Sequence, residues 1–215
     1  MLSRLNRLFK FMFRQRVLGF SVPDLPQFDK EGSAYFMDRI VNSKSYLEYG
    51  CGGSTVVAAN LKKHFVSVES DPFYLNAVRK KIKGDAVSGQ LIYANIGLTS
   101  EWGRPLIKRQ TSRRLKRWAN YAAIPWTFIK LESMPDTILV DGRFRVLCAL
   151  YSIRQLQGRE FEILFDDYTD RSNYREVERF AALHAMHGRM AIFKPAVVDL
   201  RALSESIEKF SSDYR

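Results

Sequence analysis

The sequence contains few cysteines and histidines and no long apolar run. Its 215 residues include two cysteines, Cys51 and Cys148, and three histidines. Two distant cysteines do not make a disulfide framework, so we expect a reducing compartment such as the cytoplasm. No stretch approaches the roughly 20 apolar residues of a transmembrane helix, and no repeat or low-complexity linker divides the chain. These absences favour one globular domain with a full core.

Positive charge is concentrated in two segments. Of the net charge of +11, residues 1–20 contribute +5 and residues 102–130 contribute +8, and neither segment contains an acidic residue. The rest of the chain therefore has a net charge of −2. This distribution excludes a protein coated with positive charge, such as a histone-like DNA binder. It favours an ordinary fold with two local surfaces that attract anions.

The first 29 residues form a segment of their own. Apolar residues at 2, 5, 8, 9, 12 and 13 have helical spacing, and basic residues fall mainly on the other face. This amphipathic pattern has three interpretations: a helix packed on the domain, a helix on an anionic membrane surface, or an organellar targeting peptide. A proline-containing link follows, and residues 30–215 form the main domain, with a basic insertion at about 98–130.

Strand and helix patterns alternate through the main domain. The strands are expected at 46–49, 64–69, 90–96, 137–140, 162–165 and 190–193. The helices are expected at 30–42, 54–63, 72–83, 144–157, 172–187 and 200–210. Such alternation predicts an α/β fold with a doubly wound, mostly parallel sheet flanked by helices. No clear seventh strand follows residue 193, so the sheet is expected to lack its last strand.

A cluster of glycines follows the first strand. The sequence there is Glu48-Tyr-Gly50-Cys-Gly52-Gly53-Ser54-Thr55. Glycine permits a tight turn with positive φ and a close approach of a ligand to the backbone, and the next helix presents its N-terminal N–H groups there. Glu69 ends the second strand 19 residues after Gly50, where a carboxylate can accept hydrogen bonds from both hydroxyls of a ribose. Asp71 then fits the N-cap of the next helix.

These motifs together resemble the class I S-adenosylmethionine-dependent methyltransferase family over residues 40–195. The resemblance is carried by E-x-G-x-G-G-S-T, by V-E-S-D after the second strand and by I-L-V-D-G after the fourth. It implies that the methionine part of the cofactor is lined by Glu48, Gly50, Gly52 and Ser54. It also implies that Glu69 holds the ribose, that Asn95 and Ile96 flank the adenine, and that Asp141 lies beside the methyl-donor end.

The sequence departs from the usual glycine pattern at one position. Ser54 stands in place of the third glycine, which is tolerable because Gly53 precedes it. A nicotinamide-dependent oxidoreductase is the alternative, but the third glycine of its G-x-G-x-x-G fingerprint would be Thr55.

Three carboxylates follow the fourth and fifth strands: Asp141, Asp166 and Asp167. Because these strand ends meet at one crevice, the acids could hold a divalent cation such as Mg²⁺, which would activate a hydroxyl of the acceptor. Cation-dependent O-methyltransferases have a similar arrangement. Alternatively, Asp141 or Asp167 acts as the catalytic base, or nearby arginines such as Arg143 and Arg171 neutralise the acids in ion pairs.

Other residues have a functional and a structural interpretation. Tyr168 and Tyr174 could shape the acceptor pocket or pack in the core. His184 and His187 lie three residues apart in the predicted helix 172–187, a spacing that can bind metal, although a surface pair is the simpler interpretation.

The basic insertion interleaves its arginines and lysines with Trp102, Trp118, Tyr121 and Trp126. This composition suits single-stranded nucleic acid, a sugar phosphate or an anionic glycolipid, or a helical lid whose aromatic side chains pack on the domain. The favoured function is an S-adenosylmethionine-dependent methyltransferase that modifies an oxygen of a small-molecule or glycan-like acceptor. The alternatives are a non-catalytic or membrane-docked binding protein that retained the fold, and an RNA-modifying methyltransferase.

Overall fold

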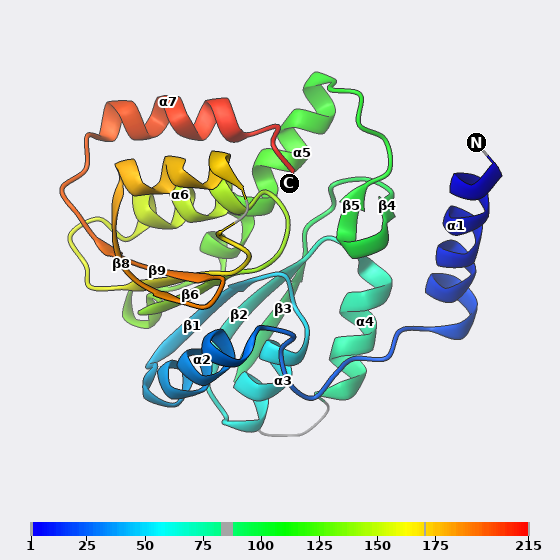
Figure 1. Cartoon of the computed structure of the whole chain (residues 1–215), viewed down its shortest axis with the longest axis horizontal. Coiled ribbons are helices and arrows are strands. Elements are labelled where there is room, and N and C mark those ends of the chain that lie inside the picture. Colours follow the sequence, from blue (N-terminus) through cyan, green and yellow to red (C-terminus); the bar gives the residue numbers. More distant parts are fainter. Residues whose placement is uncertain (1, 83–87, 170, 215) are drawn as a thin grey trace.

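A seven-stranded sheet forms the centre of the protein (Figure 1). The computed structural model describes residues 2–82, 88–169 and 171–214. The strand order across the sheet is β3-β2-β1-β6-β7-β9-β8. The strands are β1 (Ser45–Tyr49), β2 (His64–Glu69), β3 (Gly89–Tyr93), β6 (Thr137–Val140), β7 (Glu162–Phe165), β8 (Ala181–His187) and β9 (Met190–Pro195). This confirms the predicted doubly wound, mostly parallel sheet.

The order of the strands reverses at β1, which pairs in parallel with β2 on one side and with β6 on the other. β3 and β7 continue the parallel arrangement outward, and only β9 runs antiparallel to its neighbours β7 and β8. The carboxyl ends of β1, β2 and β6 therefore meet at the switch point, where ligands of such sheets bind.

The far edge of the sheet corrects the sequence prediction. Residues 172–187 were expected to form one helix, but a 3-10 helix η5 (Ser172–Arg179) is followed by strand β8. β8 is the edge strand of the sheet and most of it is exposed, including Leu183 and Met186, and Gly188, at φ 59°, makes the tight turn into β9. The alanines, leucine and methionine of this stretch are good helix formers, but sheet pairing overrides that preference. The sheet therefore has its seventh strand.

Helices cover both faces of the sheet (Figure 1). One face carries α2 (Lys30–Asn42), α3 (Gly53–Asn60) and α4 (Pro72–Lys81), and the other carries α5 (Ser112–Ala123), α6 (Arg145–Gln155) and α7 (Leu200–Phe210). Each helix buries an apolar stripe, for example Phe36 and Ile40 on one side and Leu147 and Leu203 on the other. The predicted helices 30–42 and 200–210 are confirmed; the predicted end of the third helix at residue 83 lies outside the described residues.

The basic insertion is part of the folded domain. It contains a hairpin of β4 (Thr99–Ser100) and β5 (Arg104–Pro105) around η2 (Glu101–Gly103), then α5, η3 (Ile124–Thr127) and η4 (Leu131–Ser133). Trp118 is fully buried and donates a hydrogen bond from Nε1 to the carbonyl of Ile96. Tyr121 is also buried, and Trp126 Nε1 donates to the hydroxyl of Tyr49. The prediction that aromatic side chains of the insertion pack on the domain is therefore confirmed for Trp118, Tyr121 and Trp126.

The N-terminal arm consists of α1 (Leu2–Phe13) and a π-helical turn, η1 (Arg14–Leu18). α1 lies at the periphery, beyond the β4–β5 hairpin and α4 (Figure 1). The segment from η1 to Phe20 packs on α4: the rings of Phe20 and Tyr74 are 5.4 Å apart, and the guanidinium of Arg16 lies over the ring of Phe73. None of the helices among residues 2–82, 88–169 and 171–214 is long and apolar enough to cross a membrane.

Candidate active site

The glycine turn after β1 is compressed between two backbone segments. Gly50 has φ 95°, and a Cβ atom there would lie 2.6 Å from the Cα of Gly142 in the loop after β6. On the other side, a Cβ on Gly53 would lie 2.1 Å from the carbonyl oxygen of Leu25. Only glycine fits these two positions. Gly50 has a left-handed backbone conformation, and at both Gly50 and Gly53 neighbouring backbone fills the space that a side chain would occupy. The turn ends at Gly52, which is the N-cap of α3.

Glu48 supports this turn from inside the protein. Its carboxylate is fully buried and accepts hydrogen bonds from the hydroxyls of Ser54, Thr55 and Ser67. Burial raises the pKa of Glu48 to about 7, and the three hydroxyl donors oppose that rise. Glu48 and Ser54 are thus brought together as the sequence suggested. Their contacts fix the start of α3, while direct contact of either residue with a ligand stays a prediction.

Glu69 presents a partly satisfied carboxylate at the end of β2. Oε1 accepts three hydrogen bonds, from the backbone N–H and hydroxyl of Ser70 and from the N–H of Asp71. Oε2 has one partner among the described residues, the thiol of Cys51 at 3.8 Å. A thiol is a weak donor, so Oε2 can still accept strong hydrogen bonds from another partner. Glu69 is at the same time only 8% exposed. Burial raises its pKa above the ordinary value.

The third strand ends earlier than the sequence predicted, which changes the position of Asn95 and Ile96. The strand ends at Tyr93, so Asn95 and Ile96 lie in the loop beyond it. Asn95 is exposed and accepts a hydrogen bond from the N–H of Gly97, whereas Ile96 is 2% exposed beneath Trp118. Both residues shape the loop, and their contact with an adenine ring stays a prediction.

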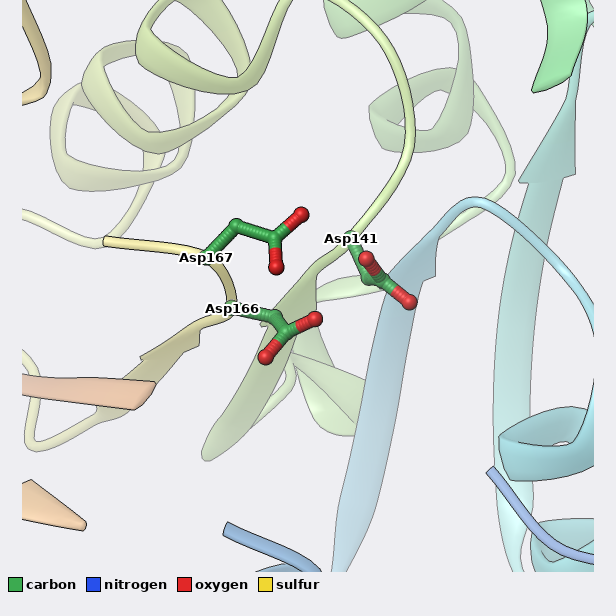
Figure 2. Close-up of side chains that lie close together, drawn as sticks. All are labelled: Asp141, Asp166 and Asp167. Carbon is green, nitrogen blue, oxygen red and sulfur yellow. The ribbon is translucent and has the colours of Figure 1, made fainter. Parts of the chain in front are cut away.

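The three carboxylates of the fourth and fifth strand ends meet in space (Figure 2). Asp141 follows β6, and Asp166 and Asp167 follow β7; one oxygen of each lies within 4.8 Å of the others. Asp167 has φ 54°, an unusual backbone conformation for a residue other than glycine. The sequence prediction that these acids form one cluster is therefore confirmed.

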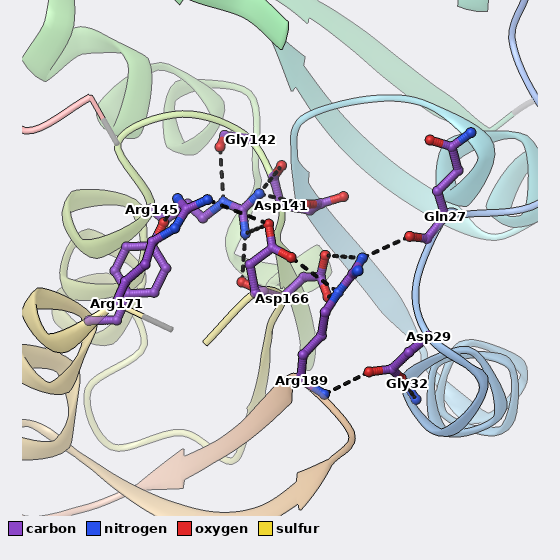
Figure 3. Close-up of polar contacts among 11 residues, drawn as sticks. Gln27, Asp29, Gly32, Asp141, Gly142, Arg145, Asp166, Arg171 and Arg189 are labelled. Carbon is purple, nitrogen blue, oxygen red and sulfur yellow. Dashed lines mark hydrogen bonds and ion pairs between the residues drawn. The ribbon is translucent and has the colours of Figure 1, made fainter. Parts of the chain in front are cut away.

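Three arginines occupy this cluster (Figure 3). Arg145 pairs with Asp141 at 2.9 Å and with Asp167 at 3.2 Å, and Arg189 pairs with both Asp166 and Asp167 at 3.1 Å. Arg171 lies 3.8 Å from Asp167. Three positive charges therefore balance three negative charges, and a divalent cation would have to displace guanidinium groups from the oxygens it needs. The residues present do not fit a resident metal ion.

Asp141 is the carboxylate with an available oxygen. Oδ1 pairs with Arg145, whereas Oδ2 has no hydrogen bond or ion pair among the described residues. Burial by the surrounding protein raises the pKa of Asp141 to about 7, with help from the charges of Asp166 and Asp167 and against the effect of Arg145. A carboxylate whose pKa lies near 7 can exchange protons at neutral pH.

Several other sequence candidates have structural roles. Tyr174 is fully buried and Tyr168 is 7% exposed, and both pack against Phe165, which confirms the packing interpretation. His184 and His187 lie on strand β8 and not on a helix, so the helical metal-binding pair is wrong. The ring of His187 stacks on Tyr35 at 4.2 Å.

Sequence reasoning missed the residues that complete the site. Arg145 and Arg189 were not singled out, although they hold the acid cluster. Arg189 comes from the β8–β9 turn, where its backbone N–H donates to Asp29 at the start of α2. Gly142 belongs to the I-L-V-D-G motif but was given no role, yet a Cβ there would lie 2.3 Å from the hydroxyl of Tyr121. The only available signal was the D-G-R-F-R sequence that begins at Asp141.

The chain has the class I methyltransferase fold. It resembles the crystal structure of a methyltransferase-like protein from Silicibacter pomeroyi DSS-3, with a TM-score of 0.76 and 29% sequence identity over 89% of this chain and 100% of that one. A candidate O-methyltransferase from Klebsiella pneumoniae matches with a TM-score of 0.43 and 15% identity, over 91% and 89% of the two chains. No protein-family model matches the sequence, and no curated protein is significantly similar to it. The first likeness supports a methyltransferase.

Proposed function

We propose that this protein is an S-adenosylmethionine-dependent methyltransferase that modifies an oxygen atom of a small-molecule or glycan-like acceptor. The observation that carries the proposal is the buried carboxylate of Glu69, whose Oε2 has one partner in the described part of the chain, a thiol 3.8 Å away. A buried acceptor without a good donor is unfavourable, and ribose hydroxyls would supply two donors. The glycine turn adds backbone that a ligand can approach closely at Gly52, where a Cβ would have only the hydroxyl of Tyr74 near it among the described residues, at 3.4 Å.

These residues fit the cofactor in two respects. Glu69 has the free accepting capacity that the ribose needs, and Gly50 and Gly142 let the loops after β1 and β6 pack backbone against backbone beside it. Glu48 and Ser54 hold the turn in place from the protein interior, through the hydrogen bond that the Ser54 hydroxyl donates to Glu48. The cofactor supplies a methyl group on a positively charged sulfur, so the chain needs chiefly to align the acceptor with it.

Asp141 is the proposed base for the acceptor hydroxyl. Its Oδ2 is available, and its pKa of about 7 allows it to take a proton at neutral pH. Asp167 is less suited to this step because both of its oxygens pair with arginines, at 3.1 and 3.2 Å. Arg145 orients Asp141 through the 2.9 Å ion pair and stays charged throughout.

The RNA-modifying alternative has less support. Single-stranded nucleic acid binds by stacking on exposed aromatic rings. In the insertion, Trp118 and Tyr121 are buried in the core, and Trp126 donates a hydrogen bond to Tyr49. Trp102 and Phe128, 72% and 48% exposed, are the exposed rings among the described residues of the insertion, too few for a stacking platform.

A second candidate function, a membrane-docked binding protein, is favoured by the N-terminal arm. Large apolar side chains are exposed there beside basic ones: Phe9, Phe13, Val17 and Leu18, with Lys10, Arg14 and Arg16. Such a surface suits an anionic membrane. Sedimentation with vesicles that contain phosphatidylserine tests this function. Binding that is lost in a Phe9→Ser, Phe13→Ser double variant would support it, and equal binding by both proteins would refute it.

The proposed enzyme function is tested by transfer of a labelled methyl group from S-adenosylmethionine to a panel of hydroxylated small molecules and glycans. The proposal expects a product with the label on oxygen, and an Asp141→Asn variant that binds the cofactor but transfers the methyl group slowly. Failure of the wild-type protein to bind S-adenosylmethionine would overturn the proposal.

A further inference from the structure

Arg143 is a buried cation without an ion-pair partner among the described residues. The residue is 8% exposed, and its Nε atom is inaccessible to solvent and has no hydrogen-bond partner among the described residues. Its guanidinium also forms no ion pair with any acid among those residues. An arginine remains protonated in proteins, so its charge cannot be removed by titration at neutral pH. Burying such a charge alone is costly.

The nearby acids are already committed to other arginines. Asp141 lies two residues before Arg143 but pairs with Arg145, and Asp166 and Asp167 pair with Arg189. With Arg145, Arg171 and Arg189 balancing these three acids, the charge of Arg143 is in excess. Burial, then repulsion by Arg145 and by Arg104 of the insertion, lowers the pKa of Arg143 below its ordinary value.

Arg143 lies beside the tip of the β4–β5 hairpin and close to Glu69, whose Oε1 would lie 3.4 Å from a Cβ on Gly103. A Cβ on Gly103, at the tip of the β4–β5 hairpin, would lie 3.9 Å from Cγ of Arg143. Tyr121 of α5 lies on the other side of this loop, where its hydroxyl would be 2.3 Å from a Cβ on Gly142, the residue before Arg143. The insertion around this point carries eight basic residues and no acid between residues 102 and 130. A field of that sign concentrates anions on this side of the sheet edge.

We propose that the acceptor is a small hydroxylated anion, such as a sugar phosphate or a hydroxy acid, whose phosphate or carboxylate group is bound by Arg143. The inference rests on the proposed methyltransferase function, in which Asp141 takes the proton of the acceptor hydroxyl. Arg143 and Asp141 belong to the same loop, so both groups of one small molecule can reach them. The planar guanidinium suits either anion, because it can donate two parallel hydrogen bonds.

Binding of inorganic phosphate and of malonate tests this proposal without the cofactor. Calorimetry at constant ionic strength compares the wild-type protein with Arg143→Gln, Arg143→Lys and the control Arg113→Gln, which removes an exposed arginine of the same insertion. We expect at least tenfold weaker binding in Arg143→Gln, an intermediate loss in Arg143→Lys and a change below twofold in Arg113→Gln. Preference for phosphate indicates a phosphorylated acceptor, and preference for malonate indicates a carboxylic acid.

Equal binding by the wild-type protein and Arg143→Gln would overturn the proposal, as would the absence of binding of both probes to the wild-type protein at up to about 50 mM. If Arg143→Gln does not fold, the Arg143 Nε–Hε resonance of ¹⁵N-labelled wild-type protein, assigned with Arg143→Lys, must shift on addition of the preferred anion. A protein that binds S-adenosylmethionine but neither anion refutes this inference alone. A protein that binds the anion through Arg143 but does not bind the cofactor refutes the proposed function and, with it, the acceptor assignment.

Discussion

The backbones of Gly50 and Gly142 are in contact, because a Cβ atom on Gly50 would lie 2.6 Å from the Cα of Gly142. This contact joins the turn after β1 to the loop that carries Asp141 and Arg143. The proposed cofactor site and the proposed acceptor site therefore share one rigid junction.

Replacement of Gly50 by alanine should damage both stability and cofactor binding. The substitution introduces a strained φ of 95° and a collision with backbone. A useful control is Gly158→Ala, where φ is 74° but nothing lies within 4 Å of the new atom. The control should lose about 1–2 kcal/mol of unfolding free energy in urea, from strain alone, and Gly50→Ala should lose about 3 kcal/mol or more. Equal losses would contradict the close contact.

Activity should depend on the ionisation of Asp141. A base must be deprotonated, so kcat/KM should rise with pH up to about 7 and then level off. Asp141→Asn should lower kcat/KM by roughly 10² to 10⁴ and abolish this inflection. Asp167→Asn removes a neighbouring negative charge that raises the pKa of Asp141, so it should move the inflection to lower pH. A rate that stays constant between pH 5 and 8 in the wild-type protein would exclude Asp141 as the base.

Stability should fall as the pH rises through the range in which Glu48 ionises. Its pKa is about 7 in the folded protein and 4.5 for an ordinary glutamate, so in this window the folded state holds a proton that the unfolded state has lost. The stabilisation from Glu48 is fully present below about pH 4.5 and is lost by about pH 7. Its size is of the order of 3 kcal/mol.

Urea denaturation of the wild-type protein and Glu48→Gln between pH 4.5 and 8 measures this effect. The stability of the variant relative to the wild type should rise between pH 4.5 and 8, because only the wild-type protein loses the stabilisation from Glu48 over this range. Parallel pH profiles for the two proteins would show that Glu48 is charged in both states.

Removal of divalent cations should leave turnover unchanged. The oxygens of Asp166 and Asp167 are paired with Arg189 and Arg145 at 3.1 and 3.2 Å, so these acids do not need a metal ion for charge balance. The measurement is methyl transfer after dialysis against EDTA, and again after addition of Mg²⁺. A loss on chelation that Mg²⁺ restores would mean that the arginines move aside for a metal.

The buried strands and the strand-end acids could be predicted from the sequence because each has a local signal. Buried parallel strands are short apolar runs, and the carboxyl ends of such strands must converge, which places Glu69, Asp141 and Asp166 at one edge. The turn at Gly50 had a similar local signal in its glycines.

The arginine network could not be predicted in the same way. Arg189 reaches Asp166 from a hairpin turn 23 residues away in sequence, and no periodicity marks such a contact. Strand β8 was missed because its helix-forming residues have an edge-strand environment that only the completed sheet provides. The unpaired state of Arg143 depends on where every nearby acid finds its partner, which is a property of the folded protein alone.

The most direct test of the account is calorimetric titration of S-adenosylmethionine into the wild-type protein and into Glu69→Gln, with the exposed Glu160→Gln as control. The amide oxygen of glutamine can keep the contacts to Ser70 and Asp71, but its NH₂ group cannot accept hydrogen bonds from ribose hydroxyls. We predict micromolar binding by the wild-type protein and the control, and at least tenfold weaker binding by Glu69→Gln. Equal affinity of all three proteins would contradict the proposed ribose site, and absence of binding to the wild-type protein would contradict the cofactor assignment itself.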